Sequence, residues 1–284
     1  MGQSFYEADA AARAVFDEAS ELLGYDMKAL CFEENEKLNL TQYTQPAMVT
    51  TGIAIMKVVE KQGLLPDTAA GLSLGEYEAL YAAGALSVTD AIRVVARRGE
   101  LMEAAVPAGV GAMAAVLGAE ASLIEETLAE IPEVWIANYN CPGQIVISGK
   151  KEAVEAAAEA LKARGIKRVL MLNVSGPFHS GLLKEAGEKL GAVLDGTEIH
   201  PLRIPYYANV TGDIVEDAAA VKGLLTEQVY SSVRFEQSIR NMLSAGVDTF
   251  YELGPGKTLA GFVKKIDRDA TVVNIETMED LSKL

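Results

Sequence analysis

Residues 71–75, which read Gly-Leu-Ser-Leu-Gly, constrain the fold more than any other stretch of this sequence. The pattern Gly-x-Ser-x-Gly is typical of a nucleophile elbow, a sharp turn that joins a strand to a helix and exposes the serine hydroxyl. A short apolar run precedes it, and a stretch with helical spacing follows it. Glycine is expected on both sides of Ser73 because the strand and the helix pass closely there. Five residues with three fixed positions recur by chance, so the rest of the chain must support this interpretation.

Short apolar runs alternate with stretches of helical spacing over most of the chain. Strands are expected at residues 68–71, 204–209, 249–253 and 271–275. Helices are expected at residues 9–23, 44–62, 88–102, 219–230, 235–245 and 258–266. Thr44 is expected to cap the second of these helices, with Pro46 in its first turn, where a missing N–H does no harm. This alternation predicts an α/β fold with a mainly parallel sheet and helices on both faces.

Residues 110–174 have a different order of elements. Strands are expected at residues 111–117, 134–138, 144–148 and 168–174, with helices at 121–130 and 151–164. The resulting order β-α-β-β-α-β is that of a ferredoxin-like fold. We therefore expect a subdomain at residues 110–174, inserted into a core made of residues 1–109 and 175–284.

The formal net charge of −15 excludes several classes of partner. A chain this acidic does not present the broad basic face that binds nucleic acids. Cys31, Cys141 and the two histidines lack the spacing of a metal site, so we expect no metal and a reducing compartment. No apolar run is long enough to span a bilayer, and the first residues lack a signal-peptide pattern. We therefore expect a cytoplasmic protein that does not contact a membrane.

A serine nucleophile needs a base, and the two histidines are the natural candidates. His200 precedes Pro201 in a polar connection and is expected at the surface. His179 lies in the loop Ser175-Gly176-Pro177-Phe178-His179-Ser180, just before a predicted helix. A lone histidine is more often structural, but an elbow serine in a histidine-poor chain favours His179 as the base. The backbone N–H of Leu74 is then expected to point to the position where an oxyanion forms.

Arg98 lies at the inner margin of the helix predicted at residues 88–102. With Val95 at the centre of the apolar face and about 100° between successive residues, Arg98 points partly inward and Arg97 points outward. An inward arginine is stabilised by an anion, whereas an arginine whose stem only follows the core edge needs none. Geometry alone leaves both alternatives open.

Several short motifs follow one another in a fixed order over nearly the whole chain. They include Thr44-Gln45-Pro46-Ala47, Gly71-Leu72-Ser73-Leu74-Gly75-Glu76-Tyr77, Arg98-Gly99-Glu100-Leu101-Met102, Asn138-Tyr139-Asn140-Cys141-Pro142-Gly143-Gln144, Gly176-Pro177-Phe178-His179-Ser180 and Ala208-Asn209-Val210-Thr211. Together they resemble the malonyl-CoA:acyl carrier protein transacylases, the acyltransferases that load malonyl units for fatty-acid synthesis. The resemblance implies an α/β-hydrolase-like catalytic core with an inserted ferredoxin-like subdomain.

The resemblance also implies a role for each candidate catalytic residue. Ser73 would attack the thioester of malonyl-CoA and carry the malonyl group as an ester, while His179 would move the proton. A backbone carbonyl near Gln228 would orient His179 in place of the carboxylate found in other triads. Arg98 would bind the malonyl carboxylate with two hydrogen bonds.

The resemblance further implies substrates and partners. Its remaining substrate-binding candidates are Leu72, Leu74, Met102, Asn140 and Phe178. The ring of Phe178 would leave no room for a methyl group at C2 of the acyl chain. The acceptor would be the phosphopantetheine thiol of an acyl carrier protein, with no cofactor beyond the coenzyme A thioester itself. We expect a monomer that docks the acidic carrier through a local basic patch within residues 150–168 or 257–268.

Two departures from the family leave other functions open. Leu72 stands where family members often have histidine. The family's N-terminal apolar strand and its Gly-Gln-Gly-x-Gln loop, which supplies an oxyanion donor, have no match here, and residues 1–7 resemble the segment that follows them. We therefore expect a sheet with an exposed edge and only Leu74 as a visible oxyanion donor. A serine hydrolase or thioesterase, and an inactive module that binds a carrier protein, are the alternatives.

Overall fold

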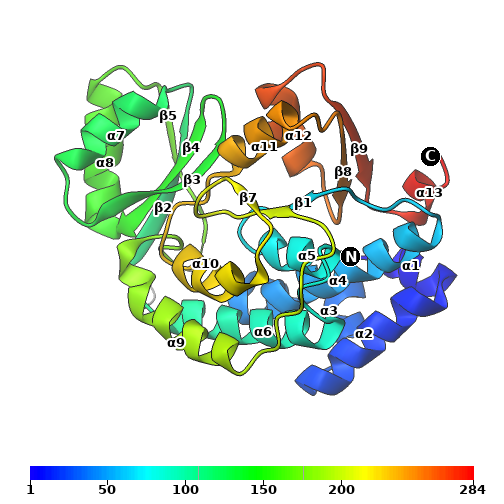
Figure 1. Cartoon of the computed structure of the whole chain (residues 1–284). Helices are drawn as coiled ribbons and strands as arrows, with labels where there is room; N and C mark the ends of the chain where they lie inside the picture. The colour runs from blue at the N-terminus through cyan, green and yellow to red at the C-terminus, as the bar shows by residue number, and fades with distance from the viewer. Residues whose placement is uncertain (108, 175) are drawn as a thin grey trace.

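The structure of the chain is a computed structural model that describes residues 1–107, 109–174 and 176–284 (Figure 1). A large part, rich in helices, carries a smaller part built on a single sheet. The helices of the large part are α1 (Gln3–Ala8), α2 (Ala10–Leu23), α3 (Met27–Phe32), α4 (Thr41–Lys61), α5 (Gly75–Ala82), α6 (Val88–Ala104), α9 (Lys184–Asp195), α10 (Val221–Gln228), α11 (Phe235–Ser244), α12 (Thr258–Ile266) and α13 (Met278–Leu281). Its strands are β1 (Ala69–Ala70), β6 (Tyr206–Tyr207), β7 (Ile214–Val215), β8 (Thr249–Leu253) and β9 (Thr271–Ile275).

Helix α4 packs against both α2 and α6, and it begins three residues earlier than predicted, at Thr41. Thr44 is not its cap, since the Thr44 hydroxyl donates to carbonyls that precede the helix. The carboxylate of Glu103 instead accepts from the backbone N–H of Gln42 at 3.0 Å. Pro46 therefore lies in the second turn. A cap supplied from 61 residues away has no local signal in the sequence.

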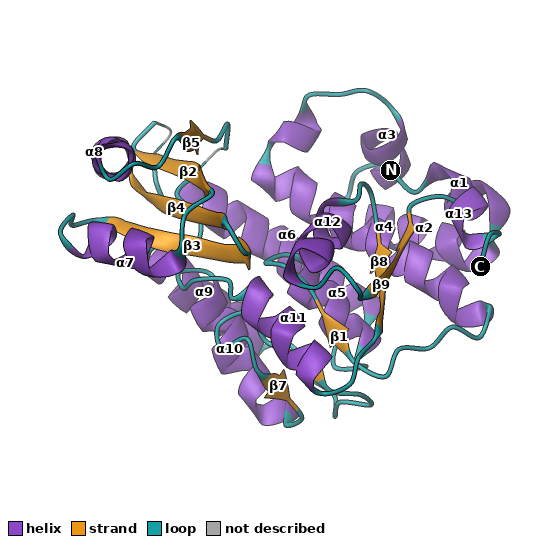
Figure 2. Ribbon diagram, turned by 90° about the horizontal axis from the view of Figure 1, so that it is seen from above, coloured by secondary structure: helices purple, strands orange, loops and turns teal. Residues whose placement is uncertain are grey.

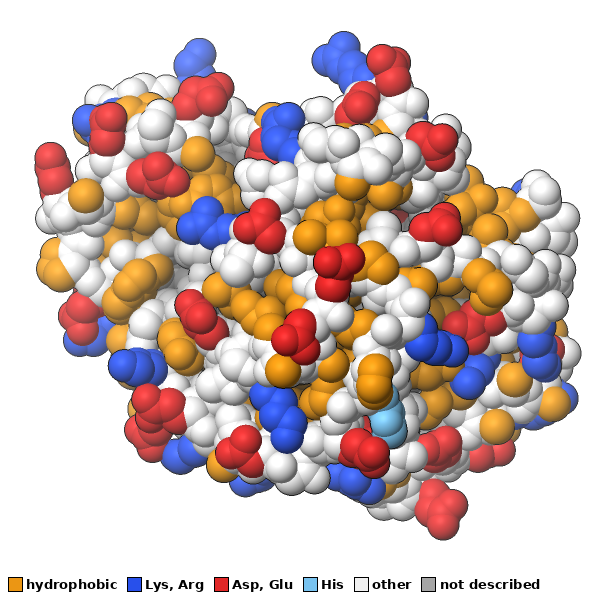
Figure 3. All heavy atoms as spheres, viewed as in Figure 1, with side chains coloured by type: hydrophobic (Ala, Val, Ile, Leu, Met, Phe, Trp, Pro, Cys, Tyr) orange, Lys and Arg blue, Asp and Glu red, His pale blue; other side chains and the backbone are white. Residues whose placement is uncertain are grey.

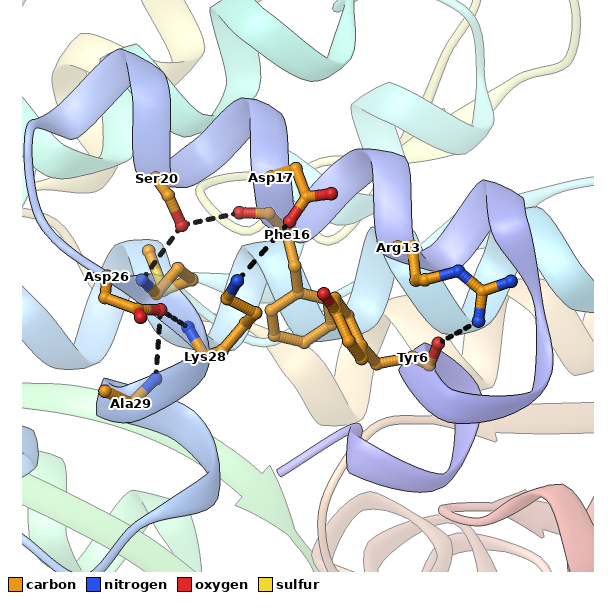
Figure 4. A network of polar contacts seen from close by, with 9 residues as sticks. Tyr6, Arg13, Phe16, Asp17, Ser20, Asp26, Lys28 and Ala29 are labelled. Carbon is orange, nitrogen blue, oxygen red and sulfur yellow. Dashed lines mark hydrogen bonds and ion pairs between the residues drawn. The ribbon is translucent and has the colours of Figure 1, made fainter.

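Polar contacts fix the connection between α2 and α3 (Figure 4). Asp26 caps α3 by accepting hydrogen bonds from backbone N–H groups in its first turn, including that of Lys28 at 2.9 Å. Ser20 of α2 accepts from the N–H of Met27 at 3.0 Å, and Lys28 forms an ion pair with Asp17 at 3.8 Å. The hydrogen bonds to Asp26 and Ser20 satisfy backbone donors that the start of a short helix leaves free.

The smaller part contains β2 (Gly111–Leu117), α7 (Ala121–Ala129), β3 (Val134–Cys141), β4 (Gln144–Lys150), α8 (Lys151–Ala163) and β5 (Arg168–Met171). Its strands form one antiparallel sheet in the order β3-β4-β2-β5 (Figure 2). Helices α7 and α8 share one apolar core with this sheet. The predicted ferredoxin-like order is confirmed. The predicted boundary after residue 174 falls at Ser175, which lies outside the described residues.

The strands of the large part form two separate sheets, which corrects the expectation of one sheet, whereas the expected open edge is present. Strand β1 pairs in parallel with β6, which pairs antiparallel with β7, while β8 and β9 form a separate parallel pair. A groove with a volume of about 710 Å³ lies between β1 and β8 and is lined by residues of both strands. The predicted α/β class is confirmed. The open edges are those of β1 and β8, which face each other across the groove.

Candidate active site

Ser73 lies in the sharp turn between β1 and α5. Its φ of 53° is in the left-handed region, which residues with a side chain rarely adopt. A Cβ added at Gly71 would lie 2.0 Å from the backbone of Gly75, so only glycine fits at position 71. A Cβ added at Gly75 would meet nothing within 4 Å. The expectation that close approach requires both glycines is therefore wrong for Gly75.

Asn209 makes two hydrogen bonds to the backbone of the elbow. Its Oδ1 accepts from the backbone N–H of Ser73 at 2.6 Å, and its Nδ2 donates to the carbonyl of Gly71 at 2.6 Å. Asn209 follows β6, and β6 runs parallel to β1, so both strands deliver their next residues to the same edge. Two short hydrogen bonds from a buried side chain thus stabilise the strained backbone at Ser73.

His179 connects Ser73 to Gln228. Its Nε2 lies 2.7 Å from the Oγ of Ser73, and its Nδ1 lies 2.7 Å from the backbone carbonyl oxygen of Gln228. A carbonyl only accepts, so Nδ1 carries the proton and Nε2 presents a lone pair to Ser73. Burial, aided by the charge of Arg98, lowers the pKa of His179 to about 4. The imidazole is therefore neutral near pH 7 and is placed to accept the serine proton.

Arg98 is buried, with 1% of its surface exposed, and its side chain points toward Ser73. Its Nη2 donates to the Oγ of Ser73 at 3.1 Å and to the Oε1 of Gln228 at 3.0 Å, while Nη1 donates to the Oε1 of Gln45 at 2.7 Å. All three acceptors are uncharged, and the buried Nε has no hydrogen-bond partner among the described residues. This burial excludes the alternative of a stem that only follows the core edge. A buried cation with uncharged direct partners favours an anionic ligand, and that role of Arg98 stays a prediction.

Leu74 and Met102 lie next to this centre. Leu74 directly precedes α5, and its backbone N–H donates to no acceptor among the described hydrogen bonds. This N–H is free to stabilise an oxyanion formed on a group attached to Ser73. The sulfur of Met102 accepts a weak hydrogen bond from the Nε2 of Gln45 at 3.6 Å. Met102 thereby supports the glutamine that holds Arg98.

The other three substrate-binding candidates lie in different surroundings. Leu72 packs against an apolar cluster that includes residues of α11 and α12. Phe178 packs against Met113 and neighbouring residues of the sheet in the smaller part. Asn140 is buried on β3, and its Oδ1 has no hydrogen-bond partner in the described part of the chain. Binding roles for these three residues, as for the other substrate-binding candidates, stay predictions.

Two site residues were absent from the sequence-based candidates, namely Gln45 and Asn209. The side chain of Gln228 was also missed, since only its carbonyl was considered. Gln45 and Asn209 lie within motifs that were recognised, at residues 44–47 and 208–211, but nothing local indicates what their side chains contact. Their partners are more than 50 positions away along the chain.

Neither a metal site nor a membrane span is evident in the described ranges. They hold no group of three His, Cys, Asp or Glu side chains arranged to bind a metal ion. No helix in them is long and apolar enough to cross a bilayer.

Acidic and basic side chains lie interspersed on the face seen in Figure 3. Several cations proposed for carrier docking have acidic neighbours. Lys150 pairs with Glu133 at 2.6 Å, and Arg164 lies 3.5 Å from a carboxylate oxygen of Glu126. These pairs are exposed and therefore weak, so an acidic partner can displace them at little cost.

Comparison with known sequences finds similarity over the whole chain. Residues 1–279 match the family described as "Acyl transferase domain". A malonyl CoA-acyl carrier protein transacylase of Bacillus subtilis (strain 168) is 48% identical over 286 residues, which cover 99% of this chain and 90% of the relative. The protein of the same name from Staphylococcus aureus (strain MRSA252) is 39% identical, with 99% and 92% covered.

Solved structures are likewise similar to this chain over its whole length. The malonyl CoA-acyl carrier protein transacylase of Clostridium perfringens superposes with a TM-score of 0.96 at 42% identity and covers 100% of this chain and 90% of its own. A malonyl-transacylase solved in complex with a type II PKS acyl-carrier protein has a TM-score of 0.96 at 39% identity, with 100% and 93% covered. At these identities the likeness extends beyond the fold.

Proposed function

The chain belongs to the malonyl CoA-acyl carrier protein transacylases of the acyl transferase family, and we propose that it transfers a malonyl group from malonyl-CoA to an acyl carrier protein. The acceptor is the phosphopantetheine thiol of the carrier, and the intermediate is a malonyl ester on Ser73. The coenzyme A thioester is the substrate, and no further cofactor takes part. We propose that the enzyme acts as a monomer in the cytoplasm.

One observation carries this proposal, namely that the hydroxyl oxygen of Ser73 contacts both a histidine base and a buried cation. The Oγ of Ser73 lies 2.7 Å from the Nε2 of His179 and 3.1 Å from the Nη2 of Arg98. An acyl group bound here carries a negative charge close to the carbonyl that Ser73 attacks. In malonyl-CoA a single methylene separates the carboxylate from the thioester carbonyl, which matches this requirement.

In the first half-reaction, Nε2 of His179 takes the proton of Ser73 as Oγ attacks the thioester carbonyl carbon. The tetrahedral oxyanion lies near the N–H of Leu74, at the start of α5, where the helix dipole favours negative charge. Collapse of this intermediate breaks the carbon–sulfur bond. His179 then returns its proton to the leaving sulfur, so coenzyme A departs as a thiol and the malonyl ester stays on Ser73.

The second half-reaction runs the same steps in reverse with a different thiol. The phosphopantetheine thiol of the carrier gives its proton to Nε2 of His179 and attacks the ester carbonyl. The carbon–oxygen bond to Ser73 breaks, and His179 returns the proton to Oγ. The carbonyl of Gln228 keeps the imidazole in the tautomer that both halves need. A neutral carbonyl is sufficient because exchange between a thioester and a thiol does not need a strongly driven base.

Arg98 supplies the preference for a dicarboxylic acyl group. Its guanidinium presents several donors in a fixed plane, which suits a carboxylate. Gln45 and Gln228 hold that plane from two sides. The ring of Phe178 limits the space for branching at C2 of the acyl group.

Mass spectrometry of a holo-acyl carrier protein incubated with the enzyme and malonyl-CoA tests this function. We expect the carrier to gain one malonyl group, and the apo-carrier, which lacks the thiol, to gain none. Free malonate released faster than the carrier is loaded would instead indicate a thioesterase. Carrier binding without acylation of carrier or enzyme would indicate an inactive binding module.

A further inference from the structure

Glu76 is a buried carboxylate with no part in the steps described above. It lies in the first turn of α5, three residues after the nucleophile, and has no exposed surface. Burial raises the pKa of Glu76 to about 7, against the opposing effect of hydrogen bonds from Gln228 and Asn209 and of the charge of Arg98. A carboxylate in such a place needs strong partners to be tolerated.

The partners of Glu76 are two residues of the site. Its Oε2 accepts from the Nε2 of Gln228 at 2.7 Å and from the backbone N–H of Asn209 at 3.2 Å. Its Oε1 has no hydrogen-bond partner among the described residues. One carboxylate oxygen therefore contacts both the residue that holds the elbow and the residue that holds Arg98.

The side chain of Gln228 bridges two buried charges. On one side its Nε2 donates to Glu76 and, at 2.8 Å, to the carbonyl of Ser73. On the other side its Oε1 accepts from the Nη2 of Arg98 at 3.0 Å. The buried carboxylate thus offsets the charge of the guanidinium through an amide, without occupying the guanidinium itself.

The orientation of the Gln228 amide is set by the two charged groups that it contacts, Arg98 and Glu76. A reversed amide would direct its NH₂ at the NH₂ of Arg98, so that two donors would meet, and its oxygen at Glu76, so that two acceptors would meet. Above pH 7 Glu76 is ionised, and its carboxylate then only accepts, whereas a guanidinium only donates. The pair therefore permits one orientation of Gln228, the one in which Oε1 faces Arg98.

We propose that Glu76 is a positioning residue for malonyl transfer, because its carboxylate fixes the amide of Gln228 and thereby aims Arg98 at the substrate carboxylate. This inference rests on the proposed function. The inference separates two contributions to selectivity, namely the charge of Arg98 and the orientation of its guanidinium.

The variant Glu76→Gln tests the proposal with little change of shape, since an amide at position 76 can turn its own NH₂ toward Gln228. We expect kcat/KM for malonyl-CoA to fall about tenfold relative to that for acetyl-CoA, the effect of weakening one hydrogen bond to a charged group. Most of the change should be in KM, since the Ser73–His179 pair is retained. A purely structural role would lower both activities alike and leave their ratio unchanged, and that result would overturn the proposal.

Two further variants make the result unambiguous. Glu78→Gln removes a carboxyl from the same helix, on the side of the groove, and should leave the malonyl-to-acetyl ratio unchanged. If Glu76→Gln does not fold, Glu76→Asp keeps the charge but is one methylene too short to reach Gln228, and the same fall in the ratio is expected. A wild type that forms no malonyl ester contradicts the proposed function, whereas an unchanged ratio in variants of an active wild type contradicts only the role of Glu76.

Discussion

The guanidinium of Arg98 donates a hydrogen bond to the hydroxyl of Ser73 over 3.1 Å, although Ser73 lies in the turn before α5 and Arg98 lies on α6. In the proposed reaction, the group that binds the substrate's carboxylate and the atom that attacks its carbonyl are therefore adjacent. This distance couples the two proposed roles, since a substrate without a carboxylate in the right place leaves the buried cation without an anion in direct contact.

Replacing Arg98 by alanine should reduce malonyl loading far more than acetyl loading. Two hydrogen bonds to a charged group contribute about 1.5–3 kcal/mol each, so we expect the ratio of kcat/KM values for malonyl-CoA and acetyl-CoA to fall at least about 100-fold. Steady-state kinetics with both thioesters measures this ratio. Arg97→Ala is the matched control, because Arg97 is exposed and pairs with Glu100. An unchanged preference in Arg98→Ala would reject the carboxylate role.

The two glycines of the elbow should respond differently to alanine. Gly71→Ala forces a Cβ into the backbone of Gly75, so we expect a loss of about 2 kcal/mol or more in the free energy of unfolding, together with most of the activity. Gly75→Ala places its Cβ in open space and should retain near wild-type stability. Thermal denaturation and acylation assays of both variants check this difference. Equal damage from the two substitutions would contradict the geometry of the turn.

The acid limb of the pH–rate profile should reflect the low pKa of His179. A base acts when it is neutral, so the rate of Ser73 acylation is retained above the pKa of about 4 and is lost as the pH falls through that value. Single-turnover acylation by malonyl-CoA between pH 4 and 8 measures the midpoint. The same midpoint should appear in Glu76→Gln, which lacks the other titrating group of the site. A midpoint near 6.5 in both proteins would contradict the conclusion that burial lowers the pKa of His179.

Local patterns were enough to predict the parts of the site whose environment is set by their own segment. Ser73 was predicted from the elbow pattern, and the inward direction of Arg98 from its angle on an amphipathic helix. Ser87 caps that helix, since its Oγ accepts from the N–H of Asp90. The order of elements in the smaller part followed from strand and helix periodicities. His179 was found because the chain offers few alternatives.

Contacts between distant segments could not be predicted in this way. Asn209 acts through a hydrogen bond to a residue 136 positions away, and Glu103 caps a helix that starts 62 residues before it. The division of the large sheet also depends on which strands meet, since β1 pairs with β6 rather than with a strand near it in sequence. Pairing of this kind leaves no periodic signal in either strand.

The burial of the Glu78 carboxyl beside the groove between β1 and β8 can be tested through the pH dependence of stability. Burial there raises the pKa of Glu78 to about 8, above the value of about 4.3 expected for the unfolded chain. The folded state therefore holds a proton more tightly, and stability should decrease as the pH rises from about 4.5 to about 8. Because the groove admits water, we expect Glu78→Gln to be more stable than wild type by only about 1 kcal/mol at pH 8.5 and equal to it at pH 5. Thermal denaturation at both pH values measures this, and a difference that does not change with pH would contradict a buried carboxyl.

The mass of the intact chain after brief exposure to malonyl-CoA tests the role of Ser73 most directly. The wild type should gain the mass of one malonyl group, and a digest should place that mass on the peptide that contains Ser73. Ser73→Ala should gain nothing under the same conditions. No covalent adduct on the wild type, or an adduct that persists in Ser73→Ala, would contradict the assignment of Ser73 as the nucleophile.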